Sequence, residues 1–236
     1  MNKSEIDVYL SLSENNLNIS AFKKSDNSII YFDNENINIK FFDEHTNLEI
    51  LKKSIEGKIK NIEKRINLFV TNIFLIVGTS ESISIDISLK RKLDNKKIQE
   101  KDIKHLIQDA KLQILKAYPD KHIVHIIVKR YIINDLNYSF VPSNINCNTI
   151  SLDIHFICFS KKLVKKIENF FANLQIYVDK IQCLYYVKNF ADEKTINNIC
   201  QIGYHLNNGL NKQEVVIIPK TIEKKGFFEK LFHFFQ

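Results

Sequence analysis

The chain has 236 residues, enough for one large domain or two small ones with a buried core. Hydrophobic residues make up 44% and charged residues 26%, which is usual for a globular protein. The net charge of +7 comes from lysines spread among Asp and Glu, with no arginine-rich run and no RNA-type aromatic motif, so we expect no nucleic-acid partner.

The cysteines and the apolar stretches indicate the redox compartment and how the chain could contact a membrane. The four cysteines lack metal-finger spacing, and MNKSEIDVYL does not resemble a signal peptide, so we expect reduced thiols in a cytoplasmic protein. The longest apolar stretch, LFVTNIFLIVG, is too short for a membrane-spanning helix. Any contact with a membrane is therefore expected to be peripheral.

The first half of the chain predicts strands, a helix and further strands. Between residues 6 and 42, apolar and polar residues alternate and the turns contain Asn and Ser, which indicates short antiparallel strands. From Leu48 to Ile66 the apolar spacing becomes helical. NLFVTNIFLIVG then predicts a buried strand and SISIDISLK an exposed one. The helix expected at about 99–117 begins with the acidic residues Glu100 and Asp102, which suit a helix start.

The second half continues as strands and helices. HIVHIIVKRYIIND and TISLDIHFICF predict strands, separated by a loop that contains Pro142. Ser160 is placed to cap the helix SKKLVKKIENFFANL. IYVDKIQCLYYV predicts another strand, and a helix at about 191–208 ends near Gly209. The expected fold class is mixed α/β.

The C-terminal residues predict an amphipathic helix. On a helix, the apolar side chains of GFFEKLFHFFQ share an arc of roughly 160°. These candidate membrane-binding side chains are Phe227, Phe228, Leu231, Phe232, Phe234 and Phe235, with Lys224, Lys225 and Lys230 available to anionic lipid. An interfacial helix of this kind supports reversible anchoring. The alternative is that residues 224–236 pack back on the domain as a last core helix.

Residues able to carry catalysis or bind a metal are not grouped in the sequence. His122 and His125 stand three apart, and on a strand such side chains point to opposite faces. Nothing in the sequence brings Asp153 and Asp179 together. Cys158 lies in an apolar run, as a buried thiol would. We therefore expect no catalytic residue, no metal site and no enzymatic activity.

In VHIIVKRYIIND and ISLDIHFICF, the middle of the chain carries motifs that resemble those of the FtsA family, the actin-like bacterial cell-division proteins. VHIIVKRYIIND is similar to the family's strand motif H-x-I-P-x-x-Y-x-[ILV]-D, with His125, Ile127 and Tyr131 in register. Val128 and Asn134 depart from its Pro and Asp. ISLDIHFICF resembles the family strand A-x-V-H-x-[IV]-x-[CA], and GFFEKLFHFFQ resembles the family's membrane-targeting helix.

The resemblance implies a division of the chain into four parts. They are a reduced actin-like, ribonuclease-H-like lobe formed by residues 1–78 with 159–208, an inserted strand-helix-strand-strand interaction subdomain at 79–158, a linker at 209–223 and the membrane-targeting helix at 224–236. In the family, the inserted subdomain mediates self-association and contacts with later division proteins. Tyr131, Tyr138 and Pro142 are therefore candidate protein-interaction residues.

The phosphate loops of the family are not matched. Where FtsA opens with D-x-G-[TS], this chain has Ser11 and Ser13, and the neighbouring Glu14 would repel phosphate. The second glycine-rich loop has no counterpart, and the chain holds only five glycines. We therefore expect the ATP site to be lost and no cofactor to be bound. The second actin-like lobe, with the family's docking site for FtsZ, is also expected to be missing.

The resemblance implies a non-enzymatic cell-division adaptor that lies at midcell on the cytoplasmic face of the inner membrane. Its expected partners are bacterial division proteins, an anionic membrane surface and a second copy of the chain. One alternative is an actin-like scaffold of the pilus-assembly type, which binds a partner peptide and packs the tail as core. Another is a degenerate nucleotide-binding protein with weak ATP affinity.

Overall fold

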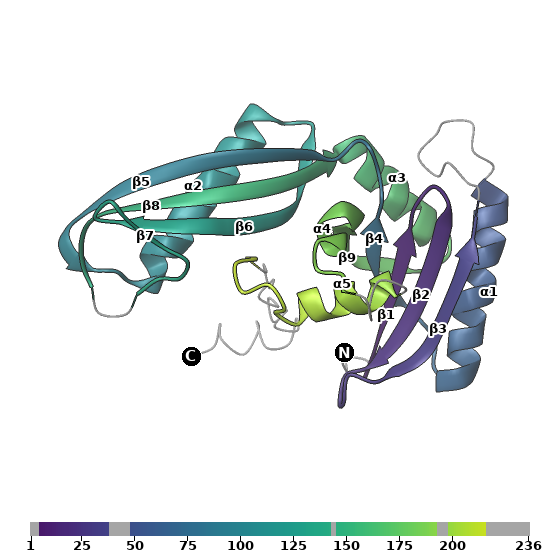
Figure 1. The fold of residues 1–236 in the computed structure, drawn as a ribbon. Helices are drawn as coiled ribbons and strands as arrows, with labels where there is room; N and C mark the ends of the chain where they lie inside the picture. Colours follow the sequence, from purple (N-terminus) through teal and green to yellow (C-terminus); the bar gives the residue numbers. More distant parts are fainter. Residues whose placement is uncertain (1–4, 38–47, 143–144, 193–197, 216–236) are drawn as a thin grey trace, which may run out of the picture.

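The computed structural model describes residues 5–37, 48–142, 145–192 and 198–215 (Figure 1). These residues form a five-stranded sheet, a four-stranded sheet and five helices. The mixed α/β class predicted from the sequence is confirmed. No helix within these ranges is both long and apolar enough to cross a membrane.

The five-stranded sheet has the order β3-β2-β1-β4-β9. Its strands are β1 (Ile6–Leu12), β2 (Asn16–Lys23), β3 (Ile29–Asn36), β4 (Asn72–Val77) and β9 (Tyr177–Cys183). β1, β2 and β3 are joined antiparallel, whereas β4 is parallel to both β1 and β9. This arrangement fits the expected ribonuclease-H-like lobe, and the central strands are apolar because helices cover both faces.

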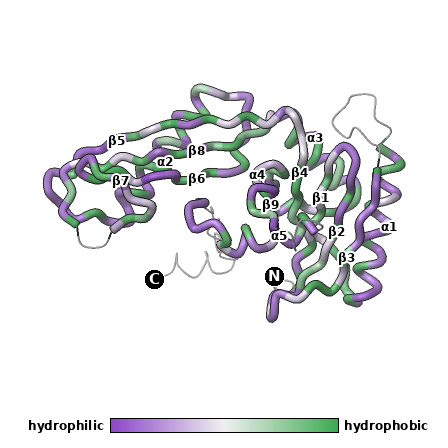
Figure 2. Tube along the Cα trace, in the orientation of Figure 1, coloured by the Kyte–Doolittle hydropathy of each residue, from purple (hydrophilic) through white to green (hydrophobic). Residues whose placement is uncertain are grey.

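Helices lie on both sides of this sheet (Figure 1). α1 (Leu48–Ile66) and α3 (Lys161–Ala172) cover one face, and the short α4 (Leu184–Lys188) leads to α5 (Ile199–Asn207) on the other. Hydrophobic and hydrophilic residues alternate along α1 in stripes (Figure 2). Its apolar stripe is buried because the predicted helical spacing turns those side chains toward the sheet.

The four-stranded sheet forms an arm that leaves the lobe after β4 and returns to it at α3 (Figure 1). Its elements are β5 (Ile83–Lys97), α2 (Glu100–Ala117), β6 (Lys121–Ile133), β7 (Leu136–Tyr138) and β8 (Asn146–Ser160). The strands are antiparallel in the order β5-β8-β6-β7. α2 covers one face, where Leu106, Ala110 and Ile114 meet the apolar side chains of β8.

Local signals placed most elements correctly. α1 spans the predicted residues, and Ser160 caps α3 by accepting a hydrogen bond from the Leu163 N–H at 3.2 Å. The strand predicted over IYVDKIQCLYYV is wrong at its end, because the strand stops at Cys183 and Leu184 starts α4. The Cys183 N–H donates to a side chain, His125, rather than to another strand, so the ladder ends there. The described part of the late helix begins at Ile199.

Candidate interaction surface of the inserted subdomain

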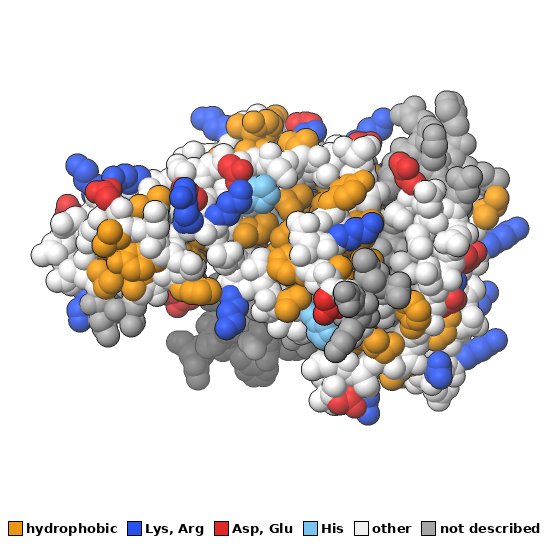
Figure 3. Space-filling view, viewed as in Figure 1, with side chains coloured by type: hydrophobic (Ala, Val, Ile, Leu, Met, Phe, Trp, Pro, Cys, Tyr) orange, Lys and Arg blue, Asp and Glu red, His pale blue; other side chains and the backbone are white. Residues whose placement is uncertain are grey.

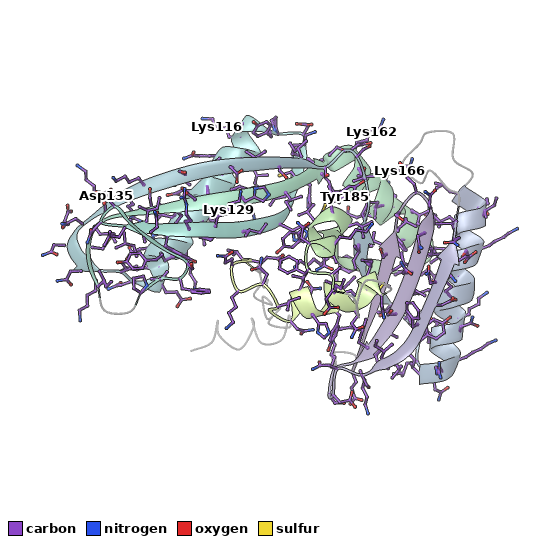
Figure 4. All side chains as sticks on the ribbon, in the orientation of Figure 1. Lys116, Lys129, Asp135, Lys162, Lys166 and Tyr185 are labelled. Atoms are coloured by element: carbon purple, nitrogen blue, oxygen red, sulfur yellow. The ribbon has the colours of Figure 1, made fainter. Side chains whose placement is uncertain are left out.

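The far end of the arm is a tight hairpin between β6 and β7. Asn134 and Asp135 form its two-residue turn with φ angles of 48° and 66°, the left-handed conformation such hairpins need. The Asn134 side chain donates to the Asn146 carbonyl at 3.1 Å and accepts from the Asn148 N–H at 2.8 Å. Figure 4 labels Asp135 at this end of the arm. The turn is therefore held in place by the start of β8.

Large apolar side chains that follow this turn in sequence are exposed. Leu136 is 62% exposed, Phe140 58% and Val141 38%, and these three residues are called the distal patch below. Figure 3 shows hydrophobic side chains gathered at this end of the molecule. Grouped apolar surface of this kind usually marks a binding site rather than chance exposure.

The predicted interaction residues lie close to the distal patch but are less accessible. Tyr131 and Tyr138 stand directly opposite each other across β6 and β7. Both pack against the core under α2, and burial raises the pKa of Tyr131. Pro142 is half-buried and follows the distal patch in sequence. Sequence reasoning missed Leu136, Phe140 and Val141, although apolar residues beside a hairpin turn were a usable signal.

The open face of the arm, opposite α2, carries charged side chains that pair with one another. His155 Nδ1 lies 2.8 Å from Asp86 Oδ1, and Lys129 Nζ lies 2.9 Å from the same oxygen. Arg130 Nε donates to Asp153 at 2.7 Å. The hydrogen bond from Lys129 lowers the pKa of Asp86, and a hydrogen bond from a serine hydroxyl, helped by Arg130, lowers that of Asp153. Exposed pairs of this kind contribute little stability.

A buried polar network joins the base of the arm to the lobe. His125 is 1% exposed, and its Nε2 accepts from the Cys183 N–H at 2.9 Å. Its Nδ1 must therefore carry the proton, which it donates to Glu214 at 2.8 Å. The other Glu214 oxygen accepts from the Tyr186 hydroxyl at 2.8 Å. Burial lowers the pKa of His125 and keeps the ring neutral, although Glu214 opposes that shift.

The same network fixes the end of the described chain against the arm. The Val128 N–H donates to the Gln213 carbonyl at 2.9 Å, and the Val215 N–H donates to the Ile126 carbonyl at 2.8 Å. Residues 213–215 therefore lie along the near edge of β6. Beyond them, the rest of the predicted linker and all predicted membrane-binding residues lie outside the described residues; these are Phe227, Phe228, Leu231, Phe232, Phe234, Phe235, Lys224, Lys225 and Lys230.

His125, considered above as a metal ligand, is thus a hydrogen-bonding residue of this network. Within the described ranges, no three His, Cys, Asp or Glu side chains come together as a metal ion would require. Cys158 is buried in the core under α2, where burial raises its pKa to about 11. A thiol with a raised pKa is a poor nucleophile.

A polar pocket lies where the sequence places the first phosphate loop of the FtsA family. It encloses about 360 Å³ beside the turn between β1 and β2 and the start of α4. The Ser13 N–H donates to the Asn16 carbonyl at 3.0 Å, and the Gly78 N–H donates to the Leu12 carbonyl at 2.9 Å. Two backbone donors that could hold a phosphate are therefore already engaged within the protein.

The turn beside this pocket also carries an acidic side chain, Glu14, which is exposed. Lys188 of α4 is the one charged side chain among the described residues that line the pocket. A phosphate site built on a glycine-rich loop gathers free N–H groups and positive charge. The residues present here do not fit the phosphates of ATP.

Comparisons with known proteins bear on the arm and on the fold. Residues 79–158 match the family model described as the SHS2 domain inserted in FtsA. No curated protein matches the chain. The cytoplasmic domain of EpsL, an inner-membrane component of the type II secretion system of Vibrio cholerae, is a similar solved structure, with 7% identity and a TM-score of 0.39. That match covers 77% of this chain and 58% of the EpsL chain.

Two other solved structures are similar at the same low level of identity. The PilM–PilN type IV pilus biogenesis complex gives 6% identity, a TM-score of 0.47 and coverage of 78% of this chain and 49% of that one. A Bacteroides thetaiotaomicron protein with an actin-like ATPase fold and unknown function gives 9% identity and a TM-score of 0.31. That match covers 79% of this chain and 55% of the other. The chain thus spans about half the length of these structures. Over residues 79–158, it is similar to the SHS2 domain inserted in FtsA.

Proposed function

We propose that this chain is an FtsA-like scaffold that binds a protein of the bacterial division machinery through the distal patch. The observation that carries the proposal is the exposure of Leu136, Phe140 and Val141 on a subdomain similar to the SHS2 domain of FtsA. Burying such side chains against a partner contributes roughly 1.5–3 kcal/mol each when burial is complete. Tyr138, on the strand that also carries Leu136, pairs with Tyr131, and Pro142 follows Val141 in sequence.

The other surfaces of the arm fit a partner less well. The open face consists of charged side chains already paired with one another, such as Asp86 with Lys129. The opposite face is covered by α2. The Leu136 part of the distal patch is also pre-organised, because the Asn134 side chain holds the adjoining turn against β8. A rigid apolar surface loses little entropy when it binds.

The second part of the proposal concerns attachment and chemistry. We infer that residues 224–236 form an amphipathic helix that tethers the scaffold to the cytoplasmic face of the inner membrane. The support is the aromatic and lysine-rich composition of that segment. The scaffold works without enzymatic activity or ATP, because the Ser13 and Gly78 N–H groups are engaged and Glu14 stands beside the pocket.

A fluorescent fusion of the full chain tests the partner surface in dividing cells. We expect the wild-type fusion at midcell, and the double variant Leu136→Ser with Phe140→Ser on the membrane but spread around the cell. The matched control is Leu68→Ser with Phe69→Ser, a pair of side chains that are 57% and 87% exposed on the lobe. The control should stay at midcell. Equal localisation of both double variants would remove the distal patch from the proposal.

The same experiment separates the alternative function. A scaffold of the pilus-assembly type would gather where pili are built instead of at the division site. If the wild-type fusion never reaches midcell but accumulates at such sites, the pilus-assembly scaffold replaces the division adaptor as the proposed function. The distal patch would remain the surface to test for the new partner.

A further inference from the structure

The polar pocket beside α4 is lined by a row of amide and hydroxyl side chains. Ser11 of β1 lies opposite Asn18 of β2, and Asn18 lies opposite Asn34 of β3. All three line the pocket, on the face of the sheet where the Ser20 hydroxyl bonds the Asn198 side chain that caps α5. Asn is unfavourable in a buried strand, so its repetition at this position conflicts with local propensity. Conflicts of this kind concentrate at functional sites.

Asn18 and a further lining residue, Asn16, present buried acceptor atoms that nothing in the described residues satisfies. Asn18 is 7% exposed, and its Oδ1 receives no hydrogen bond. Asn16 Oδ1 is buried and unpaired in the same way, and Asn16 also lines the pocket. Buried polar atoms without partners are rare in folded proteins because each one loses its hydrogen bond to water. A ligand in the pocket would supply the missing bonds.

The chemistry of the pocket selects the class of ligand. Carbonyl acceptors such as Asn16 Oδ1 and Asn18 Oδ1 require N–H or O–H donors, whereas a phosphate group brings acceptor oxygens. Lys188, on the wall formed by α4, offers donors and therefore requires an acceptor. An amide group carries one donor function and one acceptor function. The volume of about 360 Å³ suits a small ligand or a short segment of chain.

We propose that this pocket binds an amide-bearing ligand, whose N–H groups donate to Asn16 and Asn18 and whose carbonyl accepts from Lys188. The site is separate from the distal patch and from the tail. It also departs from the nucleotide that the family resemblance would place at this position. The amide comes either from the backbone of an extended peptide or from a free amino acid with an amide side chain.

Nuclear magnetic resonance of the full ¹⁵N-labelled chain tests the ligand class with three probes. N-acetyl-triglycine amide represents a peptide backbone, L-glutamine a free side-chain amide, and magnesium ATP the nucleotide. We expect saturable shifts of the Asn16 and Asn18 side-chain amide signals with one of the two amide probes. The probe that binds identifies the source. Asn18→Leu should weaken that binding about tenfold, the value of one hydrogen bond.

Two results would overturn the proposal. One is the absence of saturable shifts with both amide probes, and the other is saturation of the same signals by magnesium ATP. A result of either kind leaves the distal patch untouched, because the patch is tested by localisation with different residues. Failure of the scaffold proposal would likewise leave these titrations valid.

Thermal unfolding gives a second test that needs no ligand. Asn18→Leu removes an unpaired buried acceptor, so we expect its unfolding midpoint to rise by about 2–4 °C. The matched control is Asn207→Leu, because Asn207 Nδ2 donates to the Tyr9 hydroxyl at 2.7 Å and its Oδ1 accepts from Lys180 at 2.8 Å. The control midpoint should fall. A fall of similar size in Asn18→Leu would mean that Asn18 is a structural residue and would end the proposal.

Discussion

At the scale of single residues, His125 has the clearest role. Its motif position in β6 was visible in the sequence, but its partner was not, because Glu214 lies 89 positions away along the chain. Only the fold brings β6, the end of β9 and residues 213–215 to one point. The sequence therefore indicated the residue without its function, as is usual for contacts between distant segments.

The protonation of His125 predicts how stability depends on pH. Burial lowers its folded pKa below the unfolded value, so the unfolded chain binds the extra proton and stability falls as pH drops below about 6.5. Glu214, which has a lowered folded pKa, adds a loss of the same sign at more acidic pH. Tyr186 and Lys180 also face the pair, with the Tyr186 hydroxyl 2.8 Å and Lys180 Nζ 3.6 Å from Glu214 oxygens.

Urea unfolding at pH 7.5 and 5.5 checks this dependence. We expect the wild type to lose stability between the two values. His125→Asn, which keeps a donor for Glu214, should lose less, while costing about 1–3 kcal/mol at pH 7.5 for the orphaned Cys183 N–H. Burial also lowers the pKa of His122, so the stability of the variant still depends in part on pH. Parallel pH profiles for the two proteins would contradict the assignment.

At the scale of elements, local patterns predicted most helices and strands. α1, α2 and the Ser160 cap follow from spacing and capping residues that act within a few positions of the chain. The strand predicted for the segment after Cys183 was wrong, because β-prone residues such as Tyr185 and Tyr186 form the helix α4 instead. Tertiary contacts override propensity there, since Leu184 packs closely against Gly78.

The close packing of α5 on the sheet gives a prediction with a built-in control. A Cβ on Gly203 would lie 2.5 Å from Ile76 Cδ1 and 2.8 Å from Gln182 Oε1, so Gly203→Ala should destabilise the chain by about 1–3 kcal/mol. Gly57, in the middle of α1, has nothing within 4 Å of such an atom. Gly57→Ala should therefore stabilise by about 0.5–1 kcal/mol through its helix propensity. Chemical denaturation measures both, and a neutral Gly203→Ala would disprove the tight approach.

At the scale of the whole molecule, the sequence predicted an inserted subdomain at 79–158, the residues that the SHS2 family model matches, but not the residues that make the distal patch. The order of elements and the motif around Tyr131 were enough to place the inserted subdomain. Which apolar side chains remain exposed depends on how α2 covers the sheet, and that is decided by packing. Phe140 and Leu136 therefore emerged only from the structure.

The proposed membrane attachment is tested by co-sedimentation of the full chain with liposomes. We expect the full chain to sediment with vesicles that contain anionic lipid and to remain in solution with neutral vesicles or at high salt, because lysines near such a surface contribute about 1 kcal/mol each. Deletion of residues 224–236 should abolish sedimentation. Phe232→Ser with Phe235→Ser should weaken it strongly. Binding that survives the deletion would place the membrane contact elsewhere.

The strand-like course of residues 213–215 has a consequence for solubility. The sheet of the arm has two edges, and an uncovered edge invites pairing with another chain. β5 carries Lys90, Arg91 and Lys92 along its edge, charges that discourage such pairing. Along β6, the edge near Ile126–Val128 is covered instead by residues 213–215 of the same chain. A truncation that stops after residue 215 keeps this edge covered, whereas a shorter one exposes a template for edge-to-edge aggregation.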